Sequence, residues 1–165
     1  MAEKVAFISG GNRGLGFQTA LDLKNEGVKV VIGSRDLKQG EEAVAKLRAA
    51  GVDADVIKFD ITSEADHQAA YDYFNSQFGR LDLLVNNAGI AGGTFPGTGP
   101  EHRASDVPLD LLHNVFDTNF FAPVALTKTL LPLLKKSPAG RIVNLSSILG
   151  SLTLQADPKS PIYNA

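Results

Sequence analysis

The chain of 165 residues contains no cysteine and no tryptophan, and it has a single methionine. The absence of cysteine excludes disulfide bonds, thiolate metal sites and a thiol nucleophile. It also fits a reducing compartment such as the cytosol. Any nucleophile must then be an oxygen or nitrogen group, and no metal site is expected.

Long apolar runs and an excess of either charge are also lacking. The longest apolar stretch, 120–126, is interrupted by Pro123 and is far shorter than the roughly 20 residues that cross a bilayer. The apolar run 5–8 is too short for a signal peptide. Lys and Arg number 16 against 18 Asp and Glu, so no basic surface favours nucleic acid or an anionic membrane as a partner. We expect a cytoplasmic protein whose partner is a small molecule.

Short apolar segments alternate with longer amphipathic segments along the chain. Strands are expected at 5–8, 28–32, 56–59, 81–85 and 141–145. Helices are expected at 14–26, 37–50 and 64–78, and from Pro108 to about residue 136, with a loop at 90–107. Ser63 and Asp66 have the spacing of a capping box at the start of the third helix. The pattern predicts one α/β domain over 1–165, a Rossmann-type doubly wound parallel sheet of strand order 3-2-1-4-5.

Three glycines lie between the first expected strand and the first expected helix. Gly10, Gly14 and Gly16 form the pattern Gly-x-x-x-Gly-x-Gly. Residues without Cβ reach positive φ and let the backbone approach a diphosphate, to which the helix N-terminus presents its N–H groups. An ordinary loop is the alternative interpretation. The position between a strand and a helix favours a dinucleotide site.

Two arginines bear on which dinucleotide is bound. Arg35 ends the second strand about 20 residues beyond Gly16, where such folds place the group that meets the 2′ position of the ribose. Arg13 lies in the glycine turn and could meet the same group from the other side. Guanidinium groups bind phosphate in a bidentate manner, so NADP is favoured over NAD. Alternatively, both arginines are solvated at the surface, with Asp36 partly neutralising Arg35.

Several motifs together resemble those of the short-chain dehydrogenase/reductase family. They are Ser-Gly-Gly-Asn-Arg-Gly-Leu-Gly at 9–16, Phe-Asp-Ile at 59–61, Asn-Asn-Ala-Gly at 86–89, Asn119, and Asn-Leu-Ser-Ser at 144–147. They follow the family's order and usual spacing across nearly the whole chain. The glycine turn and the stretch Thr-Asn-Phe-Phe at 118–121 are similar to the carbonyl-reductase-like branch.

The resemblance implies an NADP-dependent oxidoreductase that transfers hydride between NADPH and a carbonyl or alcohol substrate. It assigns Asp60 and Ile61 to the adenine, and it assigns 87–89 to holding the central strand and lining the cofactor channel. Ser147 would hydrogen-bond the substrate carbonyl, and Asn119 would help to hold a water in a proton relay. The expected cofactor-binding residues are Gly10, Asn12, Arg13, Gly14, Leu15, Gly16, Arg35, Asp60, Ile61, Asn87, Ala88 and Gly89.

The two candidate catalytic residues also admit structural interpretations. Pro123 has no N–H to bond the carbonyl of Asn119, so a helix should kink there and free that carbonyl. The freed carbonyl could merely meet solvent, although the match in position favours the relay. Ser147 on its own could equally be the cap of a helix or turn.

The sequence departs from the family at its C-terminal end. The family's Tyr-x-x-x-Lys motif has no counterpart, because Tyr163 is followed only by Asn164 and Ala165. We expect Tyr163 to be a loop residue, the chain to be truncated and inactive as it stands, and the C-terminal strands and helices of the fold to be missing. The fifth strand would then be an exposed edge, so poor stability or self-association into a homo-oligomer is expected. The alternative function is a dinucleotide-binding module or sensor without chemistry.

Overall fold

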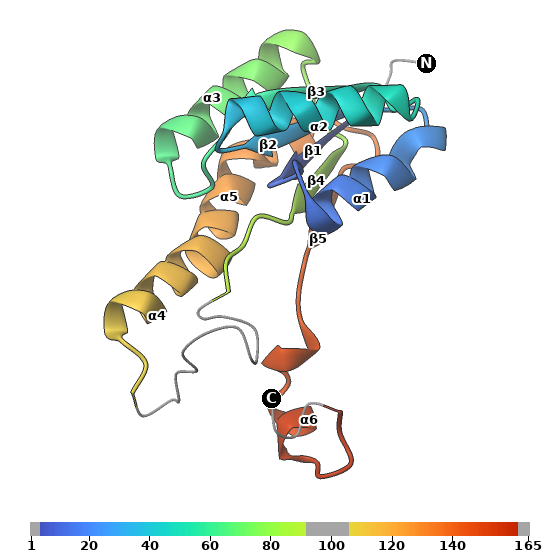
Figure 1. The fold of residues 1–165 in the computed structure, drawn as a ribbon. Coiled ribbons are helices and arrows are strands. Elements are labelled where there is room, and N and C mark those ends of the chain that lie inside the picture. The colour runs from blue at the N-terminus through green and yellow to red at the C-terminus, as the bar shows by residue number, and fades with distance from the viewer. Residues whose placement is uncertain (1–3, 92–105, 162–165) are drawn as a thin grey trace.

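A computed structural model describes residues 4–91 and 106–161 (Figure 1). Tyr163 and most of the loop expected at 90–107 lie outside these ranges. Five parallel strands form a sheet of order β3-β2-β1-β4-β5, which confirms the predicted topology. The strands are β1 (Lys4–Ser9), β2 (Val28–Ser34), β3 (Ala54–Lys58), β4 (Leu83–Asn86) and β5 (Arg141–Asn144).

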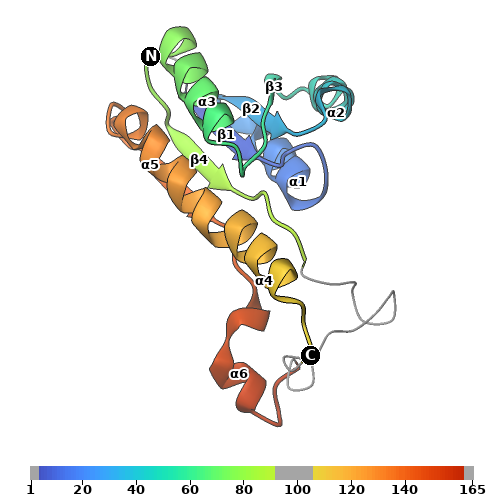
Figure 2. The same cartoon turned by 90° about the vertical axis from the view of Figure 1, so that its left-hand side faces the viewer.

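Helices cover both faces of the sheet (Figure 2). One face carries α1 (Gly14–Asp22), which a 3₁₀ turn extends over Leu23–Asn25, and α2 (Leu37–Ala49). The other carries α3 (Glu64–Gln77) and α5 (Ala122–Leu134). Before α5 come α4 (Leu109–Phe116) and a π-helical segment (Asp117–Phe121), and after β5 come a 3₁₀ turn (Ile148–Gly150) and the short α6 (Leu152–Ala156). This is the doubly wound arrangement that the sequence predicts.

The central strand β1 holds the two halves of the core together. Residues 5–8 of β1 are fully buried, as a continuous apolar run predicts for a strand covered on both faces. Val5 and Phe7 face α3 and α5, whereas Ile8 faces α1 and α2. The ring of Phe7 lies 5.1 Å from that of Phe59 and 5.2 Å from that of Phe74, between centroids. These contacts fix the strand from which the glycine turn departs.

Strand pairing shifts two predicted boundaries. β3 begins at Ala54 rather than at residue 56, because Ala54 pairs with Val30 of β2. Ala54 and Asp55 are poor strand formers, so pairing overrides propensity here. β4 begins at Leu83 rather than at residue 81, because the Leu81 N–H donates to the carbonyl of Leu133 instead of to a neighbouring strand.

The predicted capping box at the start of α3 is only half formed. Ser63 Oγ accepts from Asp66 N at 3.2 Å, as expected of an N-cap. The Asp66 carboxylate does not complete the box by bonding the N–H of Ser63. It accepts from Asp60 N at 2.7 Å, and so α3 is tied to the loop that follows β3.

The long helix predicted from Pro108 onwards is interrupted. Pro108 precedes α4 as its N-cap, and α5 ends at Leu134. Between them the π-helical segment ends at Phe121, two residues before Pro123, which occupies the first turn of α5. A proline without an N–H removes one bond of the α-helical ladder, and π segments are a common adjustment at such points.

β5 lies at one edge of the sheet and is exposed over its whole length, as the sequence analysis expects. Ile142 and Val143 point to opposite faces, and they are 41% and 45% exposed. Phe116 at the end of α4, and Phe120 and Phe121 in the π-helical segment, are also more than half exposed. Self-association through these apolar surfaces stays a prediction.

Asp82 joins several elements at the opposite end of the sheet from the glycine turn. Its Oδ2 accepts from Val5 N at 2.9 Å and from Arg80 Nε at 3.1 Å, and its Oδ1 accepts from Ser137 Oγ at 2.6 Å. Burial alone would raise the pKa of Asp82. The bonds from Ser137, Val5 and Arg80 outweigh burial and hold the pKa below its ordinary value.

We therefore expect Asp82→Asn to lower the free energy of unfolding at neutral pH by about 2 kcal/mol, because a charged acceptor of three bonds is lost. A carboxyl whose pKa is depressed by folding stabilises the fold above its unfolded-state pKa. In the wild type this contribution disappears as the pH falls below about 4. Denaturant unfolding at pH 7 and pH 3 measures it, with the exposed Asp72→Asn as the control. An equal loss at both pH values would contradict the prediction.

Candidate functional site

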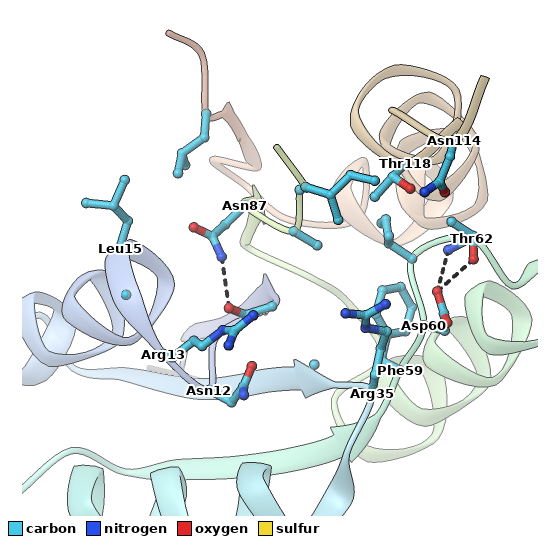
Figure 3. Close-up of a pocket in the computed structure, with 18 residues that line it drawn as sticks. Asn12, Arg13, Leu15, Arg35, Phe59, Asp60, Thr62, Asn87, Asn114 and Thr118 are labelled. Atoms are coloured by element: carbon cyan, nitrogen blue, oxygen red, sulfur yellow. Dashed lines mark hydrogen bonds between the residues drawn. The ribbon is translucent and has the colours of Figure 1, made fainter. Parts of the chain in front are cut away.

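A hollow of about 490 Å³ lies at the carboxyl ends of the strands, where the chain leaves β1, β2 and β4 (Figure 3). Every predicted cofactor-binding residue except Gly16 lines it. Residues to which the sequence analysis assigned no role in the site complete its wall: Gly33, Phe59, Thr62, Ile90, Asn114, Thr118 and Leu145. In a doubly wound sheet, ligands bind at this edge, where the strand order reverses.

Gly16 supports the hollow from behind instead of lining it. A Cβ on Gly16 would lie 2.4 Å from Asn87 Nδ2 and 2.9 Å from the carbonyl oxygen of Gly10. The same Asn87 amide donates to the carbonyls of Ser9 at 2.8 Å and Gly10 at 3.0 Å. Gly10 itself has φ of 65°. The turn and the end of β4 are thus locked together at a distance that only glycine permits.

Ser9 forms a second link between β1 and β4. Its fully buried Oγ accepts from the N–H groups of Asn87 and Ala88, both at 3.1 Å. The predicted role of residues 87–89 in holding the central strand thus has specific contacts in Asn87 and Ala88. A serine directly before the first glycine, at the end of an apolar strand, is the sequence signal for this residue.

Arg13 and Arg35 reach into the hollow from two sides (Figure 3). Neither arginine forms an ion pair with another residue in 4–91 or 106–161, whereas Lys29 pairs with Asp53 and Asp55, Arg48 with Asp55, and Arg80 with Asp82. The alternative interpretation of the sequence has the carboxylate of Asp36 partly neutralising the charge of Arg35. It caps α2 instead, accepting from Gln39 N at 3.1 Å and from Gln39 Nε2 at 3.2 Å. The arrangement leaves two guanidinium groups available to an anion in the hollow.

The loop after β3 supplies a negative charge at the far end of the hollow. The Asp60 carboxylate accepts from Thr62 N at 2.9 Å and from Thr62 Oγ1 at 2.8 Å. Burial alone would raise the pKa of Asp60, but the two bonds from Thr62 and the nearby charge of Arg35 lower it. Asp60 is therefore an ionised acceptor at neutral pH.

Asn114 and Thr118 form the wall opposite the sheet, and the sequence analysis did not assign them a role. They lie four residues apart across the junction of α4 and the π-helical segment (Figure 3). The sequence signal for them is a pair of polar residues four positions apart, a spacing that places both on one face of a helix close to Asn119. Thr118 is buried.

A second hollow, of about 840 Å³, adjoins the first. The two share Asn87, Ala88, Gly89 and Leu145. The second contains both candidate catalytic residues, Asn119 and Ser147, between α5 and β5. The cofactor-binding and catalytic candidates thus border one continuous surface.

Asn119 contacts the chain after β4 through its side chain. Its Oδ1 accepts from Ile90 N and its Nδ2 donates to the carbonyl of Ile90, both at 2.8 Å. A Cβ on Gly89 would lie 3.2 Å from Asn119 Oδ1, so this approach also needs a small residue. The sequence analysis considered only the backbone carbonyl of Asn119. The side-chain contact with Ile90 is an addition from the structure.

Ser147 acts as a turn cap in the structure. Its Oγ accepts from Leu149 N at 3.2 Å at the start of the 3₁₀ turn. Capping uses only the acceptor function of the hydroxyl, so its hydrogen can still be donated. The capping alternative and a contact with a substrate are therefore compatible.

Neither hollow is lined by a tyrosine, as far as the chain is described. Within the same ranges, no cluster of three or more His, Asp or Glu side chains could hold a metal. The described helices are all too short or too polar to cross a membrane. The two hollows offer a ligand the guanidinium groups of Arg13 and Arg35, the carboxylate of Asp60 and the hydroxyl of Ser147.

The sequence model of the family described as short chain dehydrogenase matches residues 4–165. Curated relatives include the uncharacterized oxidoreductase YxjF of Bacillus subtilis, 34% identical with 91% of this chain and 55% of that protein covered. Carbonyl reductase (NADPH) 1 of Mus musculus is 38% identical, with 92% and 51% covered. The chain spans about half the length of the curated relatives it matches.

Two solved structures of similar fold are also those of reductases. Salutaridine reductase from Papaver somniferum superposes with a TM-score of 0.81 at 30% identity, covering 92% of this chain and 60% of that one. An F189W actinorhodin polyketide ketoreductase with NADPH gives a TM-score of 0.78 at 30% identity, covering 88% and 53%.

Proposed function

The chain belongs to the short-chain dehydrogenase family, and from this premise we propose that it binds NADP(H) in the hollow above β1, β2 and β4. We further propose that it serves hydride transfer between a nicotinamide and a carbonyl or alcohol substrate, in the cytoplasm. The observation that carries the proposal is the glycine cradle beside two arginines that have no ion pair among the described residues.

The residues present fit a dinucleotide along the whole hollow. Gly10 and the N-terminus of α1 suit the diphosphate, because Gly10 has φ of 65° and a Cβ there would lie only 3.0 Å from Ala88 Cα, so the turn has no room for a side chain and its backbone stays accessible. Arg13 and Arg35 suit a 2′-phosphate. Asp60 suits the adenine amino group, since an ionised carboxylate only accepts hydrogen bonds. Residues 87–89 lie where the two hollows meet, and they suit the nicotinamide end.

NADP is favoured over NAD by charge and by the relatives. A 2′-phosphate between two guanidinium groups gains charge-assisted bonds that a 2′-hydroxyl does not. A murine relative is named for its use of NADPH, and a ketoreductase of similar fold was solved with NADPH.

Ser147 would hold the substrate carbonyl. A reduced nicotinamide, when bound, would supply hydride to the carbonyl carbon, and water would supply the proton that completes the alcohol. The Ser147 hydroxyl would donate a hydrogen bond to the carbonyl oxygen as negative charge develops there, while the bond from Leu149 N keeps the serine in place. Asn119 positions the segment around Ile90 at the border of the two hollows.

Ser147→Ala tests the catalytic part of the proposal. Loss of one donor to a developing oxyanion typically costs about 100-fold or more in kcat. We expect that fall in NADPH-dependent carbonyl reduction, with an unchanged Kd for NADPH, since Ser147 does not line the first hollow. Ser76→Ala, at an exposed position on α3 outside both hollows, is the matched control. A kcat within threefold of the wild type would contradict the assigned role.

A binding module without chemistry is the second candidate function. It is favoured by one observation, which is that no tyrosine lines either hollow in the described residues. NADPH binding without turnover of any carbonyl substrate by this chain would support this candidate.

A further inference from the structure

His67 is a buried imidazole directly behind the loop that lines the adenine end of the hollow. It lies in the first turn of α3 and is only 4% exposed. Its Nε2 lies 2.6 Å from the carbonyl oxygen of Ile61. A carbonyl only accepts, so Nε2 carries the hydrogen and donates it. The ring also stacks on Phe59, with 5.8 Å between centroids.

Asp66 forms a hydrogen bond with Asp60, the residue before Ile61. Its Oδ2 accepts from Asp60 N at 2.7 Å. Two successive side chains of one helix turn therefore hold two successive backbone groups of the loop. The fixed groups belong to the residues whose side chains line the hollow, Asp60 and Ile61.

Core packing alone does not explain a histidine at this position. An apolar side chain of similar size would fill the space between Phe59 and α3 without the cost of burying a polar ring. The imidazole satisfies the carbonyl of Ile61, which would otherwise have to turn towards water. The polar contact thus sets the orientation of the loop.

We propose that Asp66 and His67 are positioning residues for the adenine half of the cofactor. The proposal rests on the proposed binding of NADP(H). Neither residue lines the first hollow, so both act through Phe59, Asp60 and Ile61. They keep the Asp60 carboxylate and the Ile61 side chain in the orientation that receives the base before the cofactor arrives.

The expected effect follows from preorganisation. A loop that must be ordered during binding lowers affinity by the free energy of ordering it. With His67→Leu, the Ile61 carbonyl loses its donor and the loop gains freedom. The affinity for adenosine 2′,5′-bisphosphate should then fall about tenfold or more. Asp66→Ala, which frees Asp60 N, should have an effect of the same kind.

Isothermal titration with two ligands separates positioning from simple loss of structure. Adenosine 2′,5′-bisphosphate reaches the adenine loop, whereas inorganic diphosphate reaches only the glycine turn. We expect His67→Leu and Asp66→Ala to weaken the first ligand about tenfold and the second less than twofold. His67→Gln, whose amide can also donate to Ile61, should recover most of the affinity. Gln68→Ala, at an exposed position on the same helix, is the matched control.

The outcomes are distinguishable. If the wild type binds neither ligand, the proposed function fails and the positioning role fails with it. If the wild type binds but His67→Leu and Asp66→Ala bind adenosine 2′,5′-bisphosphate as tightly, the positioning role alone is wrong. Equal weakening of both ligands, or no recovery with His67→Gln, would mean that His67 only supports the fold.

Discussion

Replacing Gly16 with alanine is expected to lower the affinity for NADPH by at least about 100-fold, or roughly 3 kcal/mol. The new Cβ would lie 2.4 Å from Asn87 Nδ2 and 2.9 Å from the Gly10 carbonyl oxygen, so at least one of them must move. Moving Asn87 breaks its bonds to the carbonyls of Ser9 and Gly10. Both sides of the dinucleotide site are then displaced. Titration with NADPH, together with thermal unfolding, measures the effect.

Gly150→Ala is the control for this substitution. Gly150 has open space around the position of a Cβ, and its φ is not positive. It should therefore bind NADPH as the wild type does. If Gly16→Ala retained affinity within threefold of the wild type, the lock between the glycine turn and Asn87 would not be required for binding.

Replacing both Arg13 and Arg35 with alanine is expected to abolish the preference for the 2′-phosphate. Each guanidinium supplies charge-assisted bonds worth about 1.5–3 kcal/mol, so affinity for adenosine 2′,5′-bisphosphate should fall about 100-fold or more. Affinity for 5′-AMP should change less than threefold, because this ligand lacks the 2′-phosphate. Both are measured by titration at fixed, low ionic strength, since screening weakens such contacts.

Arg48→Ala provides the control with the same change of charge. Arg48 is bonded to Asp55 and to the carbonyl of Ala54, away from the first hollow. Its loss should leave both affinities unchanged. An equal fall for 5′-AMP and the bisphosphate in the double variant would show that the arginines support binding in general and do not read the 2′ position.

The topology could be predicted because it depends on simple patterns. The buried run of β1, the positive φ of Gly10, Gly27 and Gly51, and the alternation of strands and helices are all direct consequences of local sequence. The edge position of β5 also follows from the predicted strand order, in which the fifth strand pairs only with the fourth. Boundaries were less accurate where a partner strand determines pairing, as at Ala54.

The site could be predicted only in part, because its supports are tertiary. The glycines and Arg13 lie in one short motif, and Arg35 lies about 20 residues beyond it, where dinucleotide-binding folds place the group that meets the ribose. In contrast, the acceptor of Asp60 N is Asp66, which the sequence suggested for a capping box. The contact of Asn119 with Ile90 joins residues 29 positions apart. Such contacts depend on how helices pack on the sheet, and no local pattern specifies them.

The most direct test of the central claim is a titration of this chain with NADPH and with NADH under identical conditions. The two cofactors differ only in the 2′-phosphate that Arg13 and Arg35 are proposed to hold. We predict that NADPH binds at least about tenfold more tightly than NADH, a difference of about 1.4 kcal/mol. No detectable binding of either cofactor, or equal or tighter binding of NADH, would contradict the assignment of this hollow to NADP(H).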